Sequence, residues 1–284
     1  MPCDTGGSCL AEATTLNWTC PNCRQPLQHR DNSLVCAANH CFDRAKEGYV
    51  NLLPANRKRS KDPGDNREMI EARRRVHAAE RYRPLALRIA TMLDAEVGSA
   101  ATVLDLGCGE GYYDGVLLEQ IKGIGLFGVD VSKPAVRLAS RALPAGNFAV
   151  ASSFDVPLAD ASVDAAFSVF APTGDAELGR LLKPGGCFLD VSPGPRHLWE
   201  LRQMIYEQPR PHAPVERSLV GFDRLEHELL EFTLDLEGQG LQDLIAMTPY
   251  AYGGRRESKS QLDTLQGLNL QASFSLALYR RTPG

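Results

Sequence analysis

An apolar run that ends in three alternating glycines constrains this chain more than any other feature. Residues 103–106 read Val-Leu-Asp-Leu, Gly107, Gly109 and Gly111 follow, and a second apolar run ends at Asp130. Glycine accepts the sharp turns that bring a backbone close to a ligand, and a carboxylate at the end of the next strand accepts hydrogen bonds from ribose hydroxyls. The pattern therefore predicts a βαβ unit that binds a nucleoside.

The glycine spacing also favours one kind of nucleoside. The loop reads G-x-G-x-G, whereas dinucleotide-binding enzymes carry G-x-G-x-x-G and hold a pyrophosphate at a helix N-terminus. S-adenosylmethionine has no pyrophosphate, so the shorter spacing favours it as the cofactor over a nicotinamide nucleotide. The predicted cofactor contacts are Asp105, Gly107, Gly109, Glu110 and Asp130, with the loop amides and the Glu110 carboxylate facing the methionine end.

A cluster of metal-binding residue types precedes this unit. Its spacing is Cys20-x2-Cys23-x12-Cys36-x3-His40. Zinc prefers four thiolate or imidazole ligands in a tetrahedron, and a closed set of four leaves no position for a substrate. We therefore expect one structural zinc, whose binding supplies the folding free energy of a segment with little apolar content. Cys41 competes with His40 as the fourth ligand, and four buried, reduced thiols without metal are the alternative.

The charge of the chain is unevenly distributed. The formal net charge is −4, but the segment from Arg44 to Arg88 holds thirteen Lys or Arg residues against six acids, which leaves it at +7. A local basic surface is typical of nucleic-acid binding, and a solvated helix face with internal charge pairs is the alternative. The sequence contains no apolar stretch approaching the ~20 residues of a membrane span and no signal peptide, so we expect a cytoplasmic protein with no membrane partner.

The patterns divide the chain into four parts. We expect a disordered tail over 1–17, a zinc-binding module over 18–54, a basic helical linker over 55–98 and a methyltransferase domain over 99–284. The linker should hold two helices between 66 and 95, with a break just before Pro84. Strands are expected near 102–106, 126–130, 147–151, 163–170, 186–191, 226–235 and 268–280.

These elements predict an α/β protein. The methyltransferase domain should have the class I, Rossmann-like fold with a seven-stranded, mostly parallel sheet, and a small zinc-binding module should precede it. Residues 268–276 alternate apolar and polar side chains, which favours an antiparallel partner for the last strand.

The loops that follow the strands should carry the chemistry, because ligands of open parallel sheets lie beyond the carboxyl ends of the strands. Asp155 follows the third predicted strand, where it either contacts the adenine amino group or is a plain turn acid. The fourth strand ends at Phe170-Ala171-Pro172, where many amino-methylating enzymes carry Asn/Asp-Pro-Pro-Tyr. The general base is not identified, and the candidates are Asp190, Glu110 and His197.

Several motifs in order resemble the large-subunit ribosomal RNA guanine-N1 methyltransferases. They are the zinc cluster, KEGYVNLLP at 46–54, KDPGD at 61–65, GEGYY at 109–113 and PGPRHL at 193–198, and the likeness runs from about Cys20 to the C-terminus. The resemblance implies methyl transfer from S-adenosylmethionine to N1 of a guanine in hairpin 35 of 23S rRNA, RNA recognition by residues 18–54, and a homodimer. It also implies zinc ligands at Cys20, Cys23, Cys36 and His40 and cofactor contacts at Tyr82, Gly109, Glu110 and His197.

The expected reaction places demands on the site. Guanine N1 carries a proton at neutral pH, so methylation requires that proton to leave, and N1 must be exposed in a loop or by base flipping. Three alternatives stay open: methylation of the neighbouring guanine, which gives macrolide resistance, a small-molecule methyltransferase with the N-terminal module as a lid, and a zinc-bearing nucleic-acid binder without a working cofactor pocket. Activity indifferent to salt would favour the second, and failure to bind the cofactor would favour the third.

Overall fold

The computed structural model describes residues 17–54, 66–212, 217–248, 262 and 264–283. The predicted tail, apart from residue 17, and the basic stretch 55–65 lie outside these residues. Among the described residues, no helix is long and apolar enough to cross a membrane.

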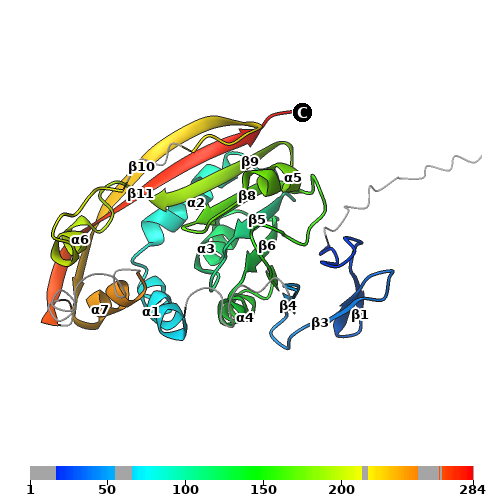
Figure 1. Cartoon of the computed structure of the whole chain (residues 1–284), viewed down its shortest axis with the longest axis horizontal. Helices are drawn as coiled ribbons and strands as arrows, with labels where there is room; N and C mark the ends of the chain where they lie inside the picture. The colour runs from blue at the N-terminus through cyan, green and yellow to red at the C-terminus, as the bar shows by residue number, and fades with distance from the viewer. Residues whose placement is uncertain (1–16, 55–65, 213–216, 249–261, 263, 284) are drawn as a thin grey trace, which may run out of the picture.

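The centre of the molecule is an eight-stranded sheet with the order β10-β11-β9-β8-β5-β6-β7-β4 (Figure 1). Pairing is parallel from β9 through to β4, while β11 runs antiparallel to both of its neighbours, as its alternating sequence predicts. The strands are β4 (Val50–Asn51), β5 (Thr102–Leu106), β6 (Gly125–Asp130), β7 (Asn147–Val150), β8 (Val163–Val169), β9 (Leu182–Pro193), β10 (Phe222–Glu237) and β11 (Gly267–Arg281).

The expected strand count of seven is one too low. All seven predicted strands are present, but β4 joins them at the edge, where Val50 and Asn51 pair with Ala149 and Val150 of β7. A two-residue strand is too short to show a strand period, and it lies in the segment assigned to the zinc module. The class I methyltransferase fold is otherwise as predicted.

Two helices precede the sheet, as expected, with a break before Pro84. They are α1 (Arg67–Ala78) and α2 (Arg83–Asp94). The Asn66 side chain caps α1 by accepting a hydrogen bond from the Met69 N–H at 2.9 Å. Pro84 lies in the first turn of α2, where its missing N–H costs no helical hydrogen bond.

The two faces of the sheet are covered differently. Buried side chains of α2, α3 (Tyr112–Gln120) and α4 (Lys133–Ala142) pack into one apolar cluster on one face. On the other face, α5 (Asp175–Leu181) shares a cluster with buried residues of the zinc module, including Trp18 and Leu27. The module therefore forms part of the core of the domain.

The zinc module is a three-stranded antiparallel sheet packed against the large one. Its strands are β1 (Gln28–Arg30), β2 (Ser33–Val35) and β3 (Cys41–Asp43). The Trp18 ring meets the Phe127 ring edge-on with centroids 5.1 Å apart, and the Thr19 N–H donates to the Pro157 carbonyl at 2.7 Å. Arg24 adds an ion pair with Asp155. These contacts and the β4 pairing fix the module on the domain.

A long ribbon extends the sheet on its other side. β10 and β11 pair along their whole length, whereas β9 pairs only with Phe274–Arg280 of β11, so the ribbon continues beyond β9 (Figure 1). It leads into α7 (Gly238–Ala246), which packs on α1, and α6 (Trp199–Ile205) packs on β11. Arg75 of α1 donates two hydrogen bonds to Asp243 of α7 at 2.8 and 2.7 Å. Since α6 begins shortly after the end of β9, it lies near the edge of the sheet where that strand ends.

Candidate functional site

The glycine loop between β5 and α3 has the geometry of a ligand cradle. Gly107, Gly109 and Gly111 all have positive φ, at 95°, 55° and 84°. A Cβ atom on Gly107 would lie closer than 3.0 Å to the Cβ atom of Ala171, so the loop packs tightly there. A Cβ atom on Gly109 would meet nothing within 4 Å. The loop therefore presents its backbone to open space at Gly109, where a ligand can approach closely.

Three acids surround this loop. Asp130, at the end of β6, accepts hydrogen bonds from the Gly109 N–H at 3.1 Å and the Ser132 N–H at 2.7 Å. Asp105 is buried, and its Oδ1 atom has no hydrogen-bond partner among the described residues. Burial, with the charges of Asp114 and Asp130, raises the pKa of Asp105 well above its usual range. An unpartnered buried oxygen beside an open backbone fits the hydrogen-bond donors of S-adenosylmethionine.

Asp114, in the first turn of α3, completes this group. Its side chain is fully buried and neither carboxylate oxygen has a partner among the described residues. Burial raises the pKa of Asp114 to about 8. Asp105 and Asp114 therefore hold at least one proton between them at neutral pH, which removes one negative charge from beside the glycine loop.

Glu110 is held by a residue that the sequence did not reveal. His77 of α1 lies with Nδ1 2.5 Å from Oε1 of Glu110, and both side chains are almost fully buried. The His77 ring stacks on Tyr112 at 4.2 Å. Burial acts to raise the pKa of Glu110, but His77 and Arg73 outweigh it and lower the pKa. Glu110 therefore stays ionised, which disfavours it as the general base and suits it to hold a cationic group.

His197 is buried on the other side of the site, in the loop after β9. Its Nδ1 atom accepts a hydrogen bond from the Ser273 N–H at 3.3 Å, and its ring lies 4.8 Å from that of Phe274. Burial lowers the pKa of His197 to about 3. When Nδ1 of a neutral imidazole accepts a hydrogen bond, the ring carries its hydrogen on Nε2. His197 is thus a hydrogen-bond donor at neutral pH, which disfavours it as the general base.

Asp190 of β9 is the third base candidate. The Ser168 hydroxyl donates to its Oδ1 atom at 3.4 Å, and Nη1 of Arg217 lies 3.6 Å from Oδ2. Burial raises the pKa of Asp190, and the opposing effect of Arg217 does not cancel it. A carboxylate with a raised pKa at the end of a central strand is the best suited of the three to accept a proton.

An exposed aromatic residue marks the end of β8. Phe170 is 44% exposed, and its φ of 59° lies in the left-handed region that a phenylalanine rarely adopts. Its ring lies 6.0 Å from that of His197. Tyr82, a predicted cofactor contact, is buried and packs edge-on against Phe274 at 5.4 Å. No sequence pattern distinguished Phe170 from the other residues of its loop.

Asp155 occupies the third strand's exit loop, as expected, but its partner is unexpected. Its carboxylate forms an ion pair with Arg24 of the zinc module. Arg24 also donates from Nη1 to the Val156 carbonyl at 3.3 Å. This pairing favours a structural role for Asp155 over a contact with adenine.

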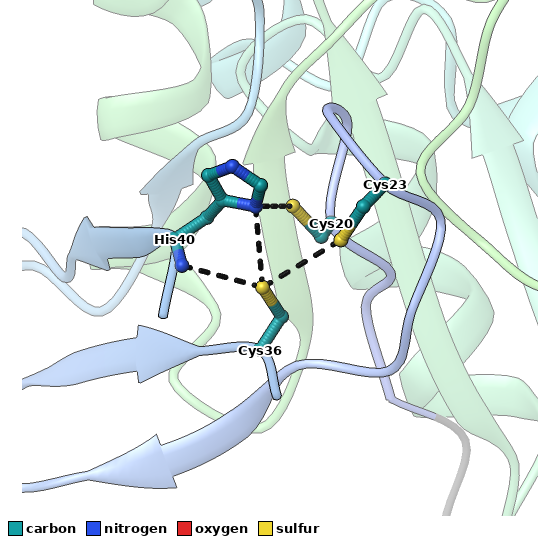
Figure 2. Close-up of side chains that lie close together, drawn as sticks. All are labelled: Cys20, Cys23, Cys36 and His40. Atoms are coloured by element: carbon teal, nitrogen blue, oxygen red, sulfur yellow. Dashed lines mark hydrogen bonds between the residues drawn. The ribbon is translucent and has the colours of Figure 1, made fainter. Parts of the chain in front are cut away.

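The structure brings the four predicted zinc ligands together (Figure 2). The Sγ atoms of Cys23 and Cys36 are 3.6 Å apart, and Nδ1 of His40 lies 3.5 and 3.4 Å from the Sγ atoms of Cys20 and Cys36. Zn–S and Zn–N bonds of ordinary length in a tetrahedron give ligand separations of about 3.5–3.8 Å. The residues therefore fit one zinc ion. Cys41 is exposed and outside the group, so it does not compete for the fourth position.

The basic segment is less free than its sequence suggests. Four arginines that contribute to its charge form ion pairs with acids of the described chain; these are Arg67, Arg75, Arg83 and Arg88. The lysines and arginines of 55–65 lie outside the described residues. The alternative interpretation, a helix face with charge pairs, is therefore correct for part of this segment.

Comparisons with known proteins cover both parts of the chain. Residues 18–61 match a family model described as the N-terminal zinc ribbon of RlmA, and residues 103–186 match a methyltransferase domain model. A Streptomyces fradiae protein named 23S rRNA (guanine(748)-N(1))-methyltransferase is 36% identical over 240 residues, covering 82% of this chain and 85% of that protein. Two further relatives, from Micromonospora griseorubida and Bacillus subtilis, are 34% and 31% identical over 82% and 91% of this chain. Both carry the name 23S rRNA (guanine-N(1)-)-methyltransferase as a provisional assignment.

Proposed function

Because this chain belongs to the family of 23S rRNA (guanine-N1)-methyltransferases, we propose that it methylates N1 of a guanine in hairpin 35 of 23S rRNA. It is an S-adenosylmethionine-dependent rRNA methyltransferase with a structural zinc site. The target is guanine 748, the position named for the Streptomyces fradiae relative, or a guanine beside it. A ribosomal substrate agrees with the cytoplasmic location expected from the sequence, and a homodimer stays an expectation from the family resemblance.

The arrangement of groups around the glycine loop supports the cofactor assignment. Asp130 would hold the ribose, and Asp105, Glu110 and the open backbone at Gly109 would face the methionine end. Tyr82 and His197 would line the same pocket, with His197 donating from Nε2. When bound, S-adenosylmethionine supplies an electrophilic methyl group on a sulfonium ion.

The environment of Asp190 is the single observation that best supports methylation at guanine N1. Guanine N1 becomes a nucleophile only when its proton leaves, and a carboxylate with a raised pKa is a better proton acceptor than an ordinary one. Ser168 and Arg217 fix its orientation. We therefore propose that Asp190 takes the N1 proton as the N1–C bond forms and the S–C bond breaks. Phe170, exposed beside it, would support the guanine ring.

The RNA would bind across both parts of the chain. We propose that residues 18–54 and the helices within 55–98 bind the hairpin by its shape and phosphates, and that residues 99–284 carry out methyl transfer. The β4 pairing and the Arg24 to Asp155 ion pair support this division of work, since they place the zinc module on the sheet that holds the cofactor loop.

The test maps the methyl group on ribosomal RNA. N1-methylguanine cannot pair, so reverse transcriptase should stop one nucleotide before it on 23S rRNA from cells with the protein and read through on RNA from a deletion strain. Complementation with Asp190→Asn should fail to restore the stop while the purified variant still binds S-adenosylmethionine. A stop that persists in the deletion strain, or methyl transfer to a metabolite instead of RNA, would contradict the proposed function.

A further inference from the structure

The loop after β9 and helix α6 form a cluster that the reaction does not use. Arg196 of the loop and Arg202 of α6 both lie over the ring of Trp199, with guanidinium carbons 5.6 and 5.7 Å from its centroid. His197, between them in the sequence, points to the site from the same loop. The cluster therefore borders the edge where the guanine would be methylated.

Arg202 is the anomalous member of this cluster. Arg202 is only 9% exposed, and its Nε and Nη1 atoms have no hydrogen-bond partner among the described residues. The ion pairs found in the described part of the chain do not include it. A guanidinium is always charged, and a buried charge without a partner is strongly unfavourable.

Two histidines lie close enough to Arg202 for its positive charge to affect them. Burial lowers the pKa of His197 and of His212, and the positive charge of Arg202 contributes to the lowering in both. The backbone N–H of His212 donates to the Pro195 carbonyl, which places this histidine against the loop that follows β9. The groups that the described residues show around Arg202 are thus two neutral imidazoles, the ring of Trp199 and the guanidinium of Arg196 over the same ring, and none of these four carries a negative charge.

We propose that Arg202, together with Arg196 and Trp199, binds a phosphate of the RNA strand next to the target guanine. This rests on the proposed function, because it requires an RNA substrate. A guanidinium fork matches the geometry of phosphate oxygens, and an aromatic ring flanked by arginines is the surface on which single-stranded nucleic acid stacks. An enzyme that exposes a paired base must also hold the backbone from which that base is turned out.

The position in the sheet favours RNA phosphate over the carboxylate of the cofactor. The glycine loop follows β5, and β8 lies between β5 and β9. Two strand spacings separate the two exit loops by about 10 Å. The methionine end of the cofactor already has Glu110 and the loop amides beside it, whereas the cluster around Trp199 lies on the side of Phe170 and Asp190.

The experiment compares Arg202→Gln and Arg202→Lys with Arg141→Gln, which removes an exposed arginine of α4 on the far part of the sheet. Binding of the hairpin 35 RNA is measured against salt, and S-adenosylmethionine binding is measured by calorimetry. Arg202→Gln should weaken RNA binding about tenfold and reduce the salt slope by about one counterion. Arg202→Lys keeps the charge but loses the fork, so it should fall between. Cofactor affinity should stay within about twofold in all three.

A second measurement locates the phosphate. Neutral methylphosphonate linkages are placed one at a time along the hairpin. One position near the target guanine should weaken binding by the wild-type protein and have no further effect on Arg202→Gln. If both proteins respond equally at every linkage, or if Arg141→Gln loses as much affinity as Arg202→Gln, the assignment is wrong.

The outcomes separate this inference from the proposed function. Loss of cofactor affinity with unchanged RNA affinity would assign Arg202 to the methionine carboxylate and overturn the phosphate site. If the wild-type protein methylates 23S rRNA but Arg202→Gln and Arg202→Lys bind RNA normally, only the inference fails. If the wild-type protein neither binds nor methylates the hairpin, both fail. Thermal unfolding of each variant shows whether its fold is retained, and Arg202→Lys keeps the test valid if the glutamine variant does not fold.

Discussion

Two alanine substitutions in one loop should separate a structural glycine from a ligand-binding one. Gly107 and Gly109 both have left-handed backbones, but only at Gly107 would a Cβ atom collide, with Ala171. At Gly109 the Cβ atom would point into open space. Gly109→Ala should therefore cost only the left-handed strain, about 1 kcal/mol. Gly107→Ala adds overpacking against a short, inflexible side chain and should cost about 3 kcal/mol or more.

For cofactor affinity the order should be reversed, and Gly109→Ala should lose more affinity than Gly107→Ala. In a chain of this size, 1 kcal/mol corresponds to a change in Tm of about 2–4 °C, so Gly109→Ala should melt only slightly below the wild type. At a cofactor concentration of 100 Kd, the wild type gains about 2.7 kcal/mol. A Cβ atom in the ligand's space should raise Kd roughly tenfold to a hundredfold, and at a hundredfold the gain falls to about 0.4 kcal/mol.

The assay is thermal unfolding with and without S-adenosylmethionine, with Kd measured by calorimetry. Gly107→Ala should show the larger loss of Tm without ligand. For Gly109→Ala, the rise in Tm on adding S-adenosylmethionine, measured from the Tm of the same variant without ligand, should be the smaller of the two. A Gly109→Ala protein that keeps its Kd within twofold, or that is as unstable as Gly107→Ala, would refute the assignment of Gly109 to the cofactor pocket.

Four further outcomes are expected. Cys23→Ser should lose the single zinc, measured by metal analysis, and loosen the N-terminal module while cofactor binding persists, because three ligands leave the site open. Asp130→Ala should weaken S-adenosylmethionine roughly tenfold to a hundredfold by calorimetry, through loss of hydrogen bonds to a charged acceptor. Asp114→Asn should stabilise the protein, and the gain in Tm should grow as the pH rises from about 4 to about 8. The reason is that the folded state keeps a proton on Asp114 up to about pH 8, whereas the unfolded chain releases it near its usual pKa of 3.8. Replacing Arg73 and Arg74 of α1 by glutamine should weaken RNA binding and flatten its salt dependence with little effect on zinc content.

Each of these has a clear contrary result. Full zinc retention in Cys23→Ser would remove it from the ligand set, and an unchanged Kd in Asp130→Ala would move the ribose elsewhere. A pH-independent effect of Asp114→Asn would mean that the carboxylate is ionised in the folded protein. An unchanged salt slope after the double arginine substitution would place the RNA on another surface.

The fold was largely predictable because its elements are long and strongly patterned. Each central strand is a continuous apolar run, and the alternation in β11 announced an antiparallel neighbour. The zinc ligands were predictable because two close pairs at hairpin spacing leave few other arrangements. The strand β4 was not predictable, since two residues carry no period and its partner β7 lies about a hundred residues away.

Single buried side chains in helices were beyond sequence reasoning. His77 and Arg202 occupy inward positions of α1 and α6, and nothing local distinguishes a histidine that holds Glu110 or an arginine without a partner from ordinary helix residues. Their roles depend on segments far away in the sequence that only folding brings together. Asp190 was identifiable as a candidate from its strand, but its advantage over Glu110 and His197 appeared only with burial and partners.

The pairing of β4 with β7 joins the zinc module to the sheet that carries the cofactor loop. If an RNA hairpin docks on the module, as proposed, it would lose its freedom to rotate and translate before a guanine reaches β8 and β9. The entropic cost of bringing RNA and cofactor together would then fall on binding at the zinc module, and the chemical step would resemble a reaction within one molecule. A fixed distance between the module and the methylation site would also determine which nucleotide of the strand reaches that site. On the proposed binding mode, a guanine one nucleotide away from the target would lie beside the methyl donor and not in front of it, so the fixed distance would help to select between adjacent guanines.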